Sequence, residues 1–159
     1  MTKQPSKHSL RKMQWKLFLL GLVKIPLIHF VRPKLIALDD HYVAVRIRLR
    51  RRTKNHLNSM YFGALAVGAD VAAGIHAFYF AEQMGSKVSF AFKSMNASFL
   101  MRAESHVVFK SNEGQLVKAA MDESKATGER VNQSITVIAE NSCGEQVARF
   151  EMVVSVKVK

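Results

Sequence analysis

The sequence predicts an α+β protein in which an antiparallel sheet curls around one long apolar helix. Residues 60–81 form a run of twenty-two residues in which only Asp70 and His76 are strongly polar. A helix that is apolar on nearly every face has to be enclosed by protein or by lipid. Segments with the alternating pattern of strands lie on both sides of this run. Ten of its residues are Ala or Gly, so strands can approach it closely, and this order of elements is typical of an α+β domain.

The same run is long enough to be considered as a membrane span. Asp70 lies in its middle, and a carboxylate at the centre of a bilayer costs on the order of a few kcal/mol or more. We therefore favour a buried helix over a membrane-spanning one. Asp70 is then a buried or half-buried carboxylate, and because burying a charged group is costly, its presence needs a structural or functional explanation. His76 falls on a different face of the helix, so a catalytic Asp–His pair within this helix is not expected.

The composition indicates a single globular domain. The chain has 159 residues, of which 48% are hydrophobic, and this length is sufficient for a sizeable core. Cys143 is the only cysteine, which excludes a disulfide within the chain and zinc sites built on two cysteines. A reducing, cytoplasmic location is therefore the expectation.

The net charge of +12 is concentrated near the N-terminus. Residues 1–54 contain fourteen Lys and Arg and two acidic residues, whereas the rest of the chain carries ten of each sign. Such an asymmetry indicates a basic face that binds nucleic acid, lipid headgroups or a phosphorylated small molecule. The alternative is a solvated charged surface without a ligand.

The N-terminal part is expected to be a basic, amphipathic helical segment, residues 1–32, ahead of a domain formed by residues 33–159. Residues 1–9 are polar and are expected to be frayed. Residues 10–31 have a helical pattern with a broad apolar face, and Pro26 should end or kink that helix. The helix either packs over the domain, which we favour, or lies on a membrane surface.

A pair of short strands is predicted before the central helix. Residues 39–41 are typical of a turn. In residues 43–50 apolar residues alternate with Ala and three arginines, so one face of this strand is lined with arginine. Asn58 or Ser59 is the expected N-cap of the helix, which should end near Gly85.

Residues 88–112 have the pattern of a strand pair. The alternation of apolar residues changes parity near Lys93 or Ser94, which a β-bulge would explain. The second strand of the pair is predicted over about residues 103–110.

The C-terminal third predicts a surface helix followed by a hairpin. The helix should be capped at Asn112 and end before Gly128. Two closing strands are expected over residues 131–140 and 146–157, joined by a turn at residues 141–144.

Residues at the start of the central helix carry a resemblance to a known family. Asn55 is followed after five residues by Tyr61-Phe62-Gly63, and Asp70 lies seven residues beyond Gly63. The chain resembles the hotdog-fold thioesterases of the phenylacetic-acid-degradation type and their uncharacterised bacterial relatives, in which an Asn, a His-Gly-Gly and an acid have this spacing. Tyr61 replaces the family's His, and Phe62 replaces its first Gly. The resemblance implies a hotdog fold, thioester hydrolysis and a composite site in which Asn55 orients the acyl group or water.

The residue types are suited to such chemistry. Thioester hydrolysis needs a carboxylate that attacks or activates water, and donors for the oxygen that becomes negative. Asp70 is the candidate for the first role, and the free N–H groups of Phe62 and Gly63 at the helix N-terminus are candidates for the second. Asp70 lies about 12 Å along the helix axis from Phe62. A second copy with an antiparallel helix is therefore required, in a homodimer or a dimer of dimers.

Five further residues are candidate substrate contacts. Arg50 and Arg52 belong to a basic run suited to the phosphates of coenzyme A. Tyr61 lies beside the candidate donors, and the resemblance suggests Ser89 or Ser94 as counterparts of serines that assist the attacking water. The expected substrate is an acyl-coenzyme A or an acyl-carrier thioester, with no cofactor beyond the coenzyme A of the substrate and no metal.

Other interpretations stay open. Asp70 as a structural acid and Asn55 as a loop or capping residue need no catalysis. At the level of the whole protein, the main alternative is a non-catalytic hotdog module that binds acyl thioesters or a protein partner, which Tyr61 and Phe62 favour. A weaker alternative is a protein that docks on nucleic acid or a membrane through residues 1–54, although no nucleic-acid-binding motif supports the former.

Overall fold

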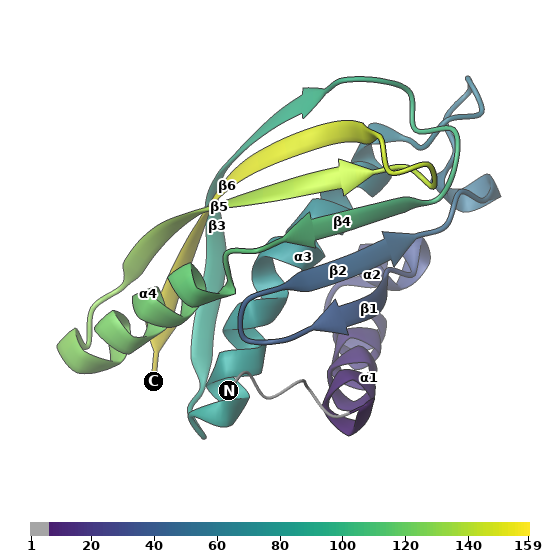
Figure 1. Ribbon diagram of the computed structural model, residues 1–159. Helices are drawn as coiled ribbons and strands as arrows, with labels where there is room; N and C mark the ends of the chain where they lie inside the picture. The colour runs from purple at the N-terminus through teal and green to yellow at the C-terminus, as the bar shows by residue number, and fades with distance from the viewer. Residues whose placement is uncertain (1–6) are drawn as a thin grey trace.

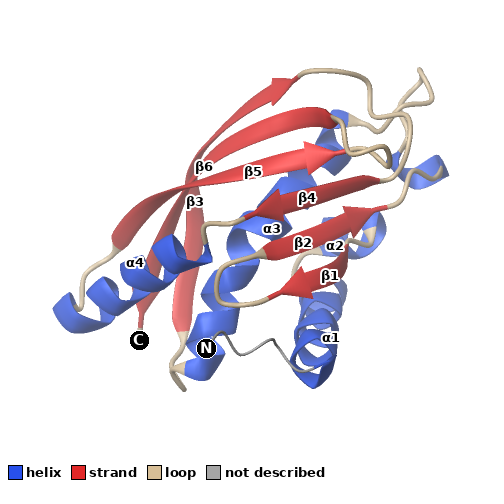
Figure 2. Cartoon of the chain, in the orientation of Figure 1, coloured by secondary structure: helices blue, strands red, loops and turns tan. Residues whose placement is uncertain are grey.

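The computed structural model describes residues 7–159, which form a six-stranded antiparallel sheet curved over one long helix (Figure 1). That helix, α3 (Phe62–Gln83), lies against the concave face of the sheet. Two N-terminal helices, α1 (Lys7–Val23) and α2 (Pro26–Val31), lie beside it, near the first two strands (Figure 2). The predicted α+β architecture is confirmed.

The sheet has the spatial order β1-β2-β4-β5-β6-β3, and each neighbouring pair is antiparallel. The strands are β1 (Lys34–Leu38), β2 (Val43–Ile47), β3 (Val88–Phe99), β4 (Val107–Ser111), β5 (Val131–Glu140) and β6 (Gln146–Val158). The closing hairpin of β5 and β6 agrees with the sequence prediction.

The prediction that β3 and β4 pair with each other is wrong. β3 lies at one edge of the sheet beside β6, whereas β4 lies between β2 and β5. The reason is strand length: β3 has 12 residues and β6 has 13, whereas β4 has only 5. Only β6 can satisfy the backbone of β3 along its whole length. The predicted bulge is confirmed, because the register of β3 on β6 shifts between Phe92 and Ser94.

Close packing against small residues encloses α3. Fifteen of its 22 residues are buried. The Phe109 ring of β4 lies directly on Gly68, where an added methyl group would come within 2.2 Å of the ring. Among the helices of residues 7–159, α3 alone is long and apolar enough to cross a membrane. Of its most apolar stretch of 18 residues, 83% is buried inside the protein. It therefore occupies the position of a core helix.

The start of α3 differs from the prediction that Asn58 or Ser59 is its N-cap. The helix begins at Phe62 after Tyr61, which makes no side-chain capping bond. Asn58 has a φ of 60° and belongs to the preceding turn, so its backbone cannot lead directly into a helix. The helix ends two residues before Gly85, close to the predicted end.

The surface helix α4 (Gly114–Thr127) packs against β5, β6 and α3. Its N-cap is Glu113 and not the predicted Asn112, because the Glu113 carbonyl accepts the first helical N–H groups, from Leu116 at 3.1 Å and Val117 at 3.4 Å. The Glu113 carboxylate accepts the backbone N–H of Thr136 in β5 at 2.6 Å. Its end before Gly128, which has a φ of 73°, agrees with the prediction.

The N-terminal helices share the core of the domain. α1 ends at Val23 and Pro26 opens α2, as the position of the proline predicted. Their inner residues are buried in the same apolar core as the sheet: Met13, Leu17, Ile28 and Val31. Residues 1–6, which belong to the segment predicted to be frayed, lie outside the described residues.

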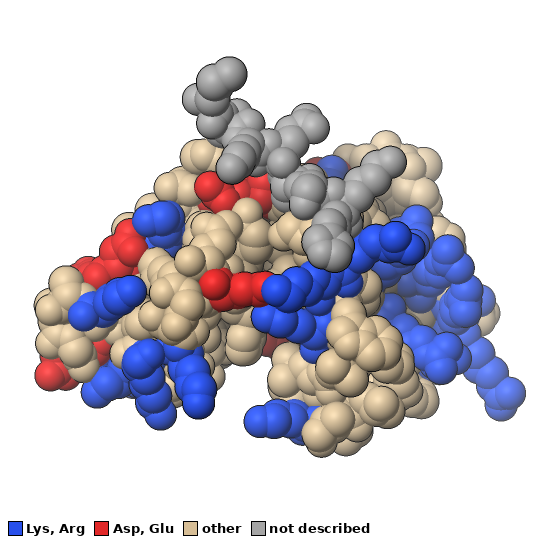
Figure 3. Space-filling model, turned by 90° about the horizontal axis from the view of Figure 1, so that it is seen from below, with Lys and Arg blue, Asp and Glu red and all other residues tan. Residues whose placement is uncertain are grey.

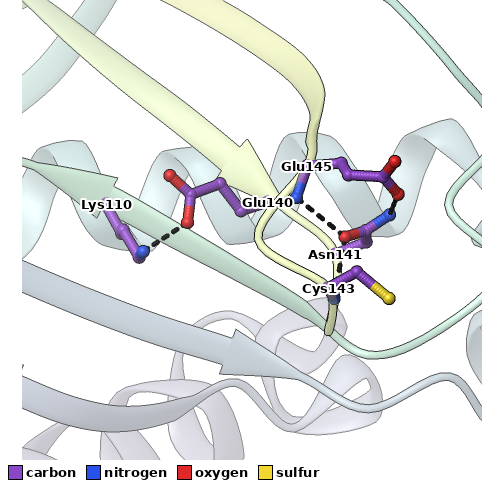
Figure 4. A network of polar contacts seen from close by, with 5 residues as sticks. All are labelled: Lys110, Glu140, Asn141, Cys143 and Glu145. Atoms are coloured by element: carbon purple, nitrogen blue, oxygen red, sulfur yellow. Dashed lines mark hydrogen bonds and ion pairs between the residues drawn. The ribbon is translucent and has the colours of Figure 1, made fainter.

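The turn between β5 and β6 is closed by the side chain of Asn141 (Figure 4). Its Oδ1 accepts the backbone N–H groups of Cys143 and Glu145, each at 2.9 Å. An ion pair of Lys110 with Glu140 joins β4 to β5 close to the turn. The Cys143 thiol is exposed on this turn.

The contact between Gly68 and Phe109 generates a prediction about stability. Gly68→Ala is expected to lower the midpoint of urea unfolding, because overpacking a core costs about 1–3 kcal/mol. The higher helix propensity of alanine relative to glycine offsets only about 1 kcal/mol of this loss. Phe109→Leu in the same chain should recover part of the loss in a double-mutant cycle, since it removes the clashing ring edge. A single Gly68→Ala variant that is more stable than the wild type would contradict this packing.

Candidate functional site

Two backbone donors are free at the N-terminal end of α3. The N–H groups of Ala64 and Leu65 both bond to the Tyr61 carbonyl, at 2.9 and 3.2 Å. Within residues 7–159, the N–H groups of Phe62 and Gly63 have no acceptor. Free N–H groups at a helix N-terminus are suited to binding an oxyanion. They are the two donors that the sequence analysis selected.

Aromatic side chains border these donors. The Tyr61 ring lies over Gly63, where an added methyl group would come within 2.4 Å of the ring. The Phe62 side chain is 60% exposed, and its ring centroid lies 4.8 Å from that of Tyr61 and 6.4 Å from that of Phe99. A hollow of about 520 Å³ beside them is lined by Asn55, Tyr61, Phe62, Phe99 and neighbouring residues.

Asn55 lines this hollow, but its side chain holds its own loop together. Its Oδ1 accepts the N–H groups of Leu57 and Ser59, at 2.9 and 3.2 Å. Its Nδ2 donates to the Ser59 hydroxyl at 3.0 Å. These bonds shape the loop that leads into α3. Asn55 therefore has the structural role in a loop that was one of the two interpretations of this residue from the sequence.

Asp70 lies on another face of α3, in an apolar cavity of about 750 Å³. The cavity lies between α1, α3 and the start of β3, and its apolar lining includes Leu17, Ile28, Gly74, Phe78 and Phe90. Charged side chains also line it: Lys16, Lys24, Glu82 and Lys87.

The Asp70 carboxylate has no hydrogen bond or ion pair within the part of the chain that the structure describes. The Asp70 carboxyl is mostly buried, and burial raises its pKa from 3.8 to about 6. A carboxylate with this pKa is largely ionised at neutral pH and still basic enough to accept a proton, which is the requirement for a general base.

Within one chain, the candidate carboxylate and the candidate donors do not meet. Asp70 lines the cavity beside α1, whereas Phe62 borders the hollow at the helix N-terminus, and the two spaces share no lining residue. A single copy therefore presents two separate halves of the predicted site.

The edge of the sheet offers a surface for a second copy. β3 pairs with β6 on one side only, so its other side is a free strand edge among the described residues. Exposed apolar side chains lie on or directly after this strand: Met95, Phe99, Leu100 and Met101. A long edge strand of this kind readily pairs with another chain.

The predicted arginine face forms a basic hollow beside α2. β2 ends at Ile47, earlier than predicted, because the Thr53 hydroxyl donates to the Arg48 carbonyl at 2.8 Å and closes a short turn, η1 (Arg51–Thr53). A hollow of about 300 Å³ there has no acidic side chain among its described lining residues, and its cations are Arg32, Lys34, Arg46, Arg48, Arg50 and Arg52. The Arg46 Nε atom is buried and has no hydrogen-bond partner among residues 7–159.

The structure separates Ser89 and Ser94 from the other candidates. Ser89 lies opposite Lys157 of β6, and Ser94 lies opposite Val153. These two β6 residues alternate with the buried residues that face α3, so both serines lie on the outer face of the sheet. Ser89 accepts a hydrogen bond from Arg130 at 2.8 Å on that outer face. The physical reason is strand parity, since the residues on either side of each serine point to the opposite face.

His76 is kept apart from Asp70, as predicted. Its Nε2 lies 2.9 Å from the Asp39 carbonyl oxygen and its ring stacks on Phe80. Burial lowers the pKa of His76, which favours a neutral imidazole that donates to this carbonyl. The residue is therefore a packed core histidine.

The contribution of α1 to the cavity was not predicted from the sequence. Lys16 and Leu20 of α1, and Lys24 directly after it, line the cavity together with Asp70. Their helical spacing was visible in the sequence, but the sequence did not show which element this helix faces.

Residues 7–159 contain no group of three or more His, Cys, Asp or Glu side chains able to hold a metal ion.

Comparison with solved structures identifies the fold. A protein of unknown function from Chlorobaculum tepidum has a TM-score of 0.81 at 12% sequence identity, covering 95% of this chain and 99% of its own. A probable thioesterase from Pseudomonas aeruginosa has a TM-score of 0.71 at 16% identity, covering 99% of both chains. A thioesterase from Haemophilus influenzae has a TM-score of 0.63 at 12% identity, covering 87% of both chains. No curated protein sequence matches this chain.

These similarities, together with the curved sheet around α3, define the chain as a hotdog-fold protein of the kind found in thioesterases. Residues 14–156 match the family model described as a domain of unknown function, DUF4442. The chain belongs to that family.

The raised pKa of Asp70 generates a prediction about stability and pH. The folded protein binds a proton at Asp70 more tightly than the unfolded chain does. Protonation of Asp70 therefore favours the folded state fully below about pH 4, and this contribution to the free energy of unfolding is lost as the pH rises through about 6. The penalty at neutral pH is about 3 kcal/mol. Asp70→Asn should therefore raise Tm at about pH 8 and leave it nearly unchanged at about pH 4.

Thermal melts monitored by circular dichroism at both pH values measure this effect. The exposed Asp122 on α4 provides a matched control, since Asp122→Asn removes a carboxylate that is not buried. A Tm gain for Asp70→Asn that is equal at both pH values would contradict a buried carboxylate with a raised pKa.

Proposed function

We propose that this protein hydrolyses acyl thioesters, acyl-coenzyme A being the foremost candidate, in a site shared by two copies of the chain. The observation that carries the proposal is the Asp70 carboxylate, which has no partner among the described residues and a pKa of about 6, in an apolar cavity of about 750 Å³. The free N–H groups of Phe62 and Gly63 support it, because they are donors without a structural acceptor.

The reaction follows from these groups. Asp70 takes a proton from a water molecule while the water oxygen attacks the thioester carbonyl carbon. The carbonyl oxygen becomes negative and accepts hydrogen bonds from the N–H groups of Phe62 and Gly63 of the second copy. The carbon–sulfur bond then breaks, and the thiolate takes the proton held by Asp70, which leaves the carboxylic acid and the free thiol and returns Asp70 to its ionised form. Direct attack by the Asp70 carboxylate is the other route, with a mixed anhydride that water hydrolyses.

A two-fold dimer would supply the missing half of each site. The free edge of β3 and the exposed apolar residues along it are the surface available for such pairing. Antiparallel packing of two α3 helices then sets Asp70 of one copy against Phe62 of the other, twice in each dimer. A dimer of dimers would keep the same pair of sites.

The surroundings of the two groups suggest where the substrate binds. The apolar cavity beside Asp70 has the size and lining of a site for an acyl chain. Arg50 and Arg52 lie in the basic hollow beside α2 and are suited to the phosphates of coenzyme A, since arginine binds two phosphate oxygens at once. On this proposal the protein needs no cofactor beyond the coenzyme A of its substrate and acts in the cytoplasm.

Two observations favour a non-catalytic module that binds acyl thioesters or a protein partner. Phe62 places an aromatic ring at the start of α3, and the Asn55 side chain is engaged by its own loop. A panel of short, long and aromatic acyl-coenzyme A compounds separates the two functions. Release of free thiol supports the hydrolase, whereas binding without release supports the module.

Asp70 is expected to be essential for hydrolysis. Asp70→Asn should lower kcat by about 10²–10⁴-fold, because the amide cannot accept the proton of water. In the wild type, kcat/KM should rise with pH through about 6 as the Asp70 carboxyl ionises. Thiol release recorded across this pH range measures both effects, and an Asp70→Asn variant with wild-type kcat would refute this role of the residue.

The donor role of the Phe62 N–H can be tested without unfolding the helix. Phe62→Pro removes this N–H at the first helical position, where proline is well tolerated, and Tyr61 already has the extended conformation that precedes proline. The variant should lose about 10²–10³-fold in kcat. Phe62→Ala is the matched control, since it removes the ring but keeps the N–H.

A hybrid experiment tests whether the site is composite. Asp70→Asn and Phe62→Pro chains, each inactive as a homodimer, should form hybrids in which one site is fully wild-type and the other carries both changes. Activity that returns on co-expression supports a site built from two copies. Hybrids that form but stay inactive, or a strictly monomeric active protein, would rule it out.

A further inference from the structure

We propose that the outer face of the α1–α2 pair binds the surface of a membrane that contains anionic phospholipids. We call this face, residues 15–30, the N-terminal apolar face. It presents eight large apolar side chains to solvent: Trp15, Phe18, Leu19, Leu22, Val23, Ile25, Leu27 and Phe30. Apolar exposure on this scale marks a surface that binds something.

The core holds this face in place. Met13 and Leu17 of α1, and Ile28 and Val31 of α2, are buried against the domain, so the opposite sides of both helices point outward. Trp15 is 60% exposed and stacks on Phe18 with ring centroids 5.4 Å apart. An exposed, stacked aromatic pair beside leucines is suited to the boundary between headgroups and acyl chains, where tryptophan is enriched.

Unpaired cations adjoin the apolar side chains. The Arg52 guanidinium lies 5.9 Å from the centre of the Phe30 ring, and Phe30 lines a hollow together with Arg50, Arg51 and Arg52. Lys24 and Arg32 also follow directly on the two helices. Among the described residues none of these five cations has an ion pair, in contrast to Lys12 and Lys16, which bind Glu82. Figure 3 shows the largest group of lysines and arginines on the right of this view, beside a mostly uncharged lobe, with smaller groups at the lower left and at the end of that lobe.

This combination selects an anionic bilayer over the other occupants. A second copy seated on this face by two-fold symmetry would bring its own unpaired cations against those of the first, and like charges repel. Nucleic acid would bind the cations but leave eight large apolar side chains without a partner. An anionic bilayer receives the apolar side chains and attracts the basic ones, each of which contributes to binding near the surface.

Attachment through this face would also bring the Asp70 cavity to the membrane. Lys24 and Ile25, at the turn between α1 and α2, line that cavity and are themselves exposed. An acyl chain could then enter from the lipid surface. This consequence rests on the proposed function, whereas the attachment itself does not.

The single tryptophan of the chain, Trp15, reports directly on this face. The full-length protein is mixed with vesicles of phosphatidylcholine alone or of equal parts phosphatidylcholine and phosphatidylglycerol. The expected result is a blue shift of Trp15 emission and co-sedimentation with the anionic vesicles only, weakened by salt. No shift with either vesicle, or equal binding to both, would overturn the proposal.

Substitutions within the face and outside it separate the possible occupants. Leu22→Glu with Leu27→Glu should weaken vesicle binding about tenfold or more and leave the fold intact, since these side chains are 52% and 58% exposed. Leu116→Glu on α4, at a side chain 42% exposed, is the matched control and should bind like the wild type. Thiol release measured without vesicles should be unchanged in both, which keeps this test independent of the hydrolase proposal.

Two other outcomes would assign the face to a different occupant and overturn the proposal. A lower oligomeric state of the Leu22→Glu, Leu27→Glu variant in light scattering would identify a second copy. Tight binding of duplex DNA that Arg51→Glu abolishes, together with no response to either vesicle, would identify nucleic acid.

Discussion

The enclosure of α3 is the constraint on which the rest of the structure depends. This helix has almost no polar side, so the sheet has to curve over it and α1 has to cover part of what remains. Close approach is possible because small residues meet aromatic rings, Gly68 under Phe109 and Gly74 under Phe90. The strand order follows from the same requirement, since the two longest strands, β3 and β6, pair along their lengths at one side of the helix.

Asp70 is the point at which this enclosure carries a cost. An ionised carboxylate without a partner destabilises a core. The packing of an apolar helix such as α3 does not require one. In the hydrolase that we propose, the position of Asp70 beside a cavity and the pKa that burial raises to about 6 make it a base at neutral pH. Strained or destabilised groups of this kind are concentrated at functional sites.

Local sequence patterns predicted the elements well and their neighbours poorly. The proline at 26, the parity change near Ser94 and the glycine at 128 each act within a few residues, and the structure agrees with all three. The pairing of β3 with β4 and the side-chain cap of α3 were wrong, because each depends on competition with distant partners. The placement of Ser89 and Ser94 on the outer face has the same origin, since alternation specifies two faces without saying which one meets the helix.

The sequence by itself determined that a long apolar helix containing one carboxylate would form the centre of an α+β fold, and that its free N-terminal donors lie too far from Asp70 to act in one chain. Composition and spacing along a single helix suffice for both conclusions. Only the tertiary structure decided that α1 walls the Asp70 cavity, that Asn55 is held by its own loop, and that the β3 edge and the N-terminal apolar face remain open. These features arise from contacts between segments far apart in the chain, which no local pattern encodes.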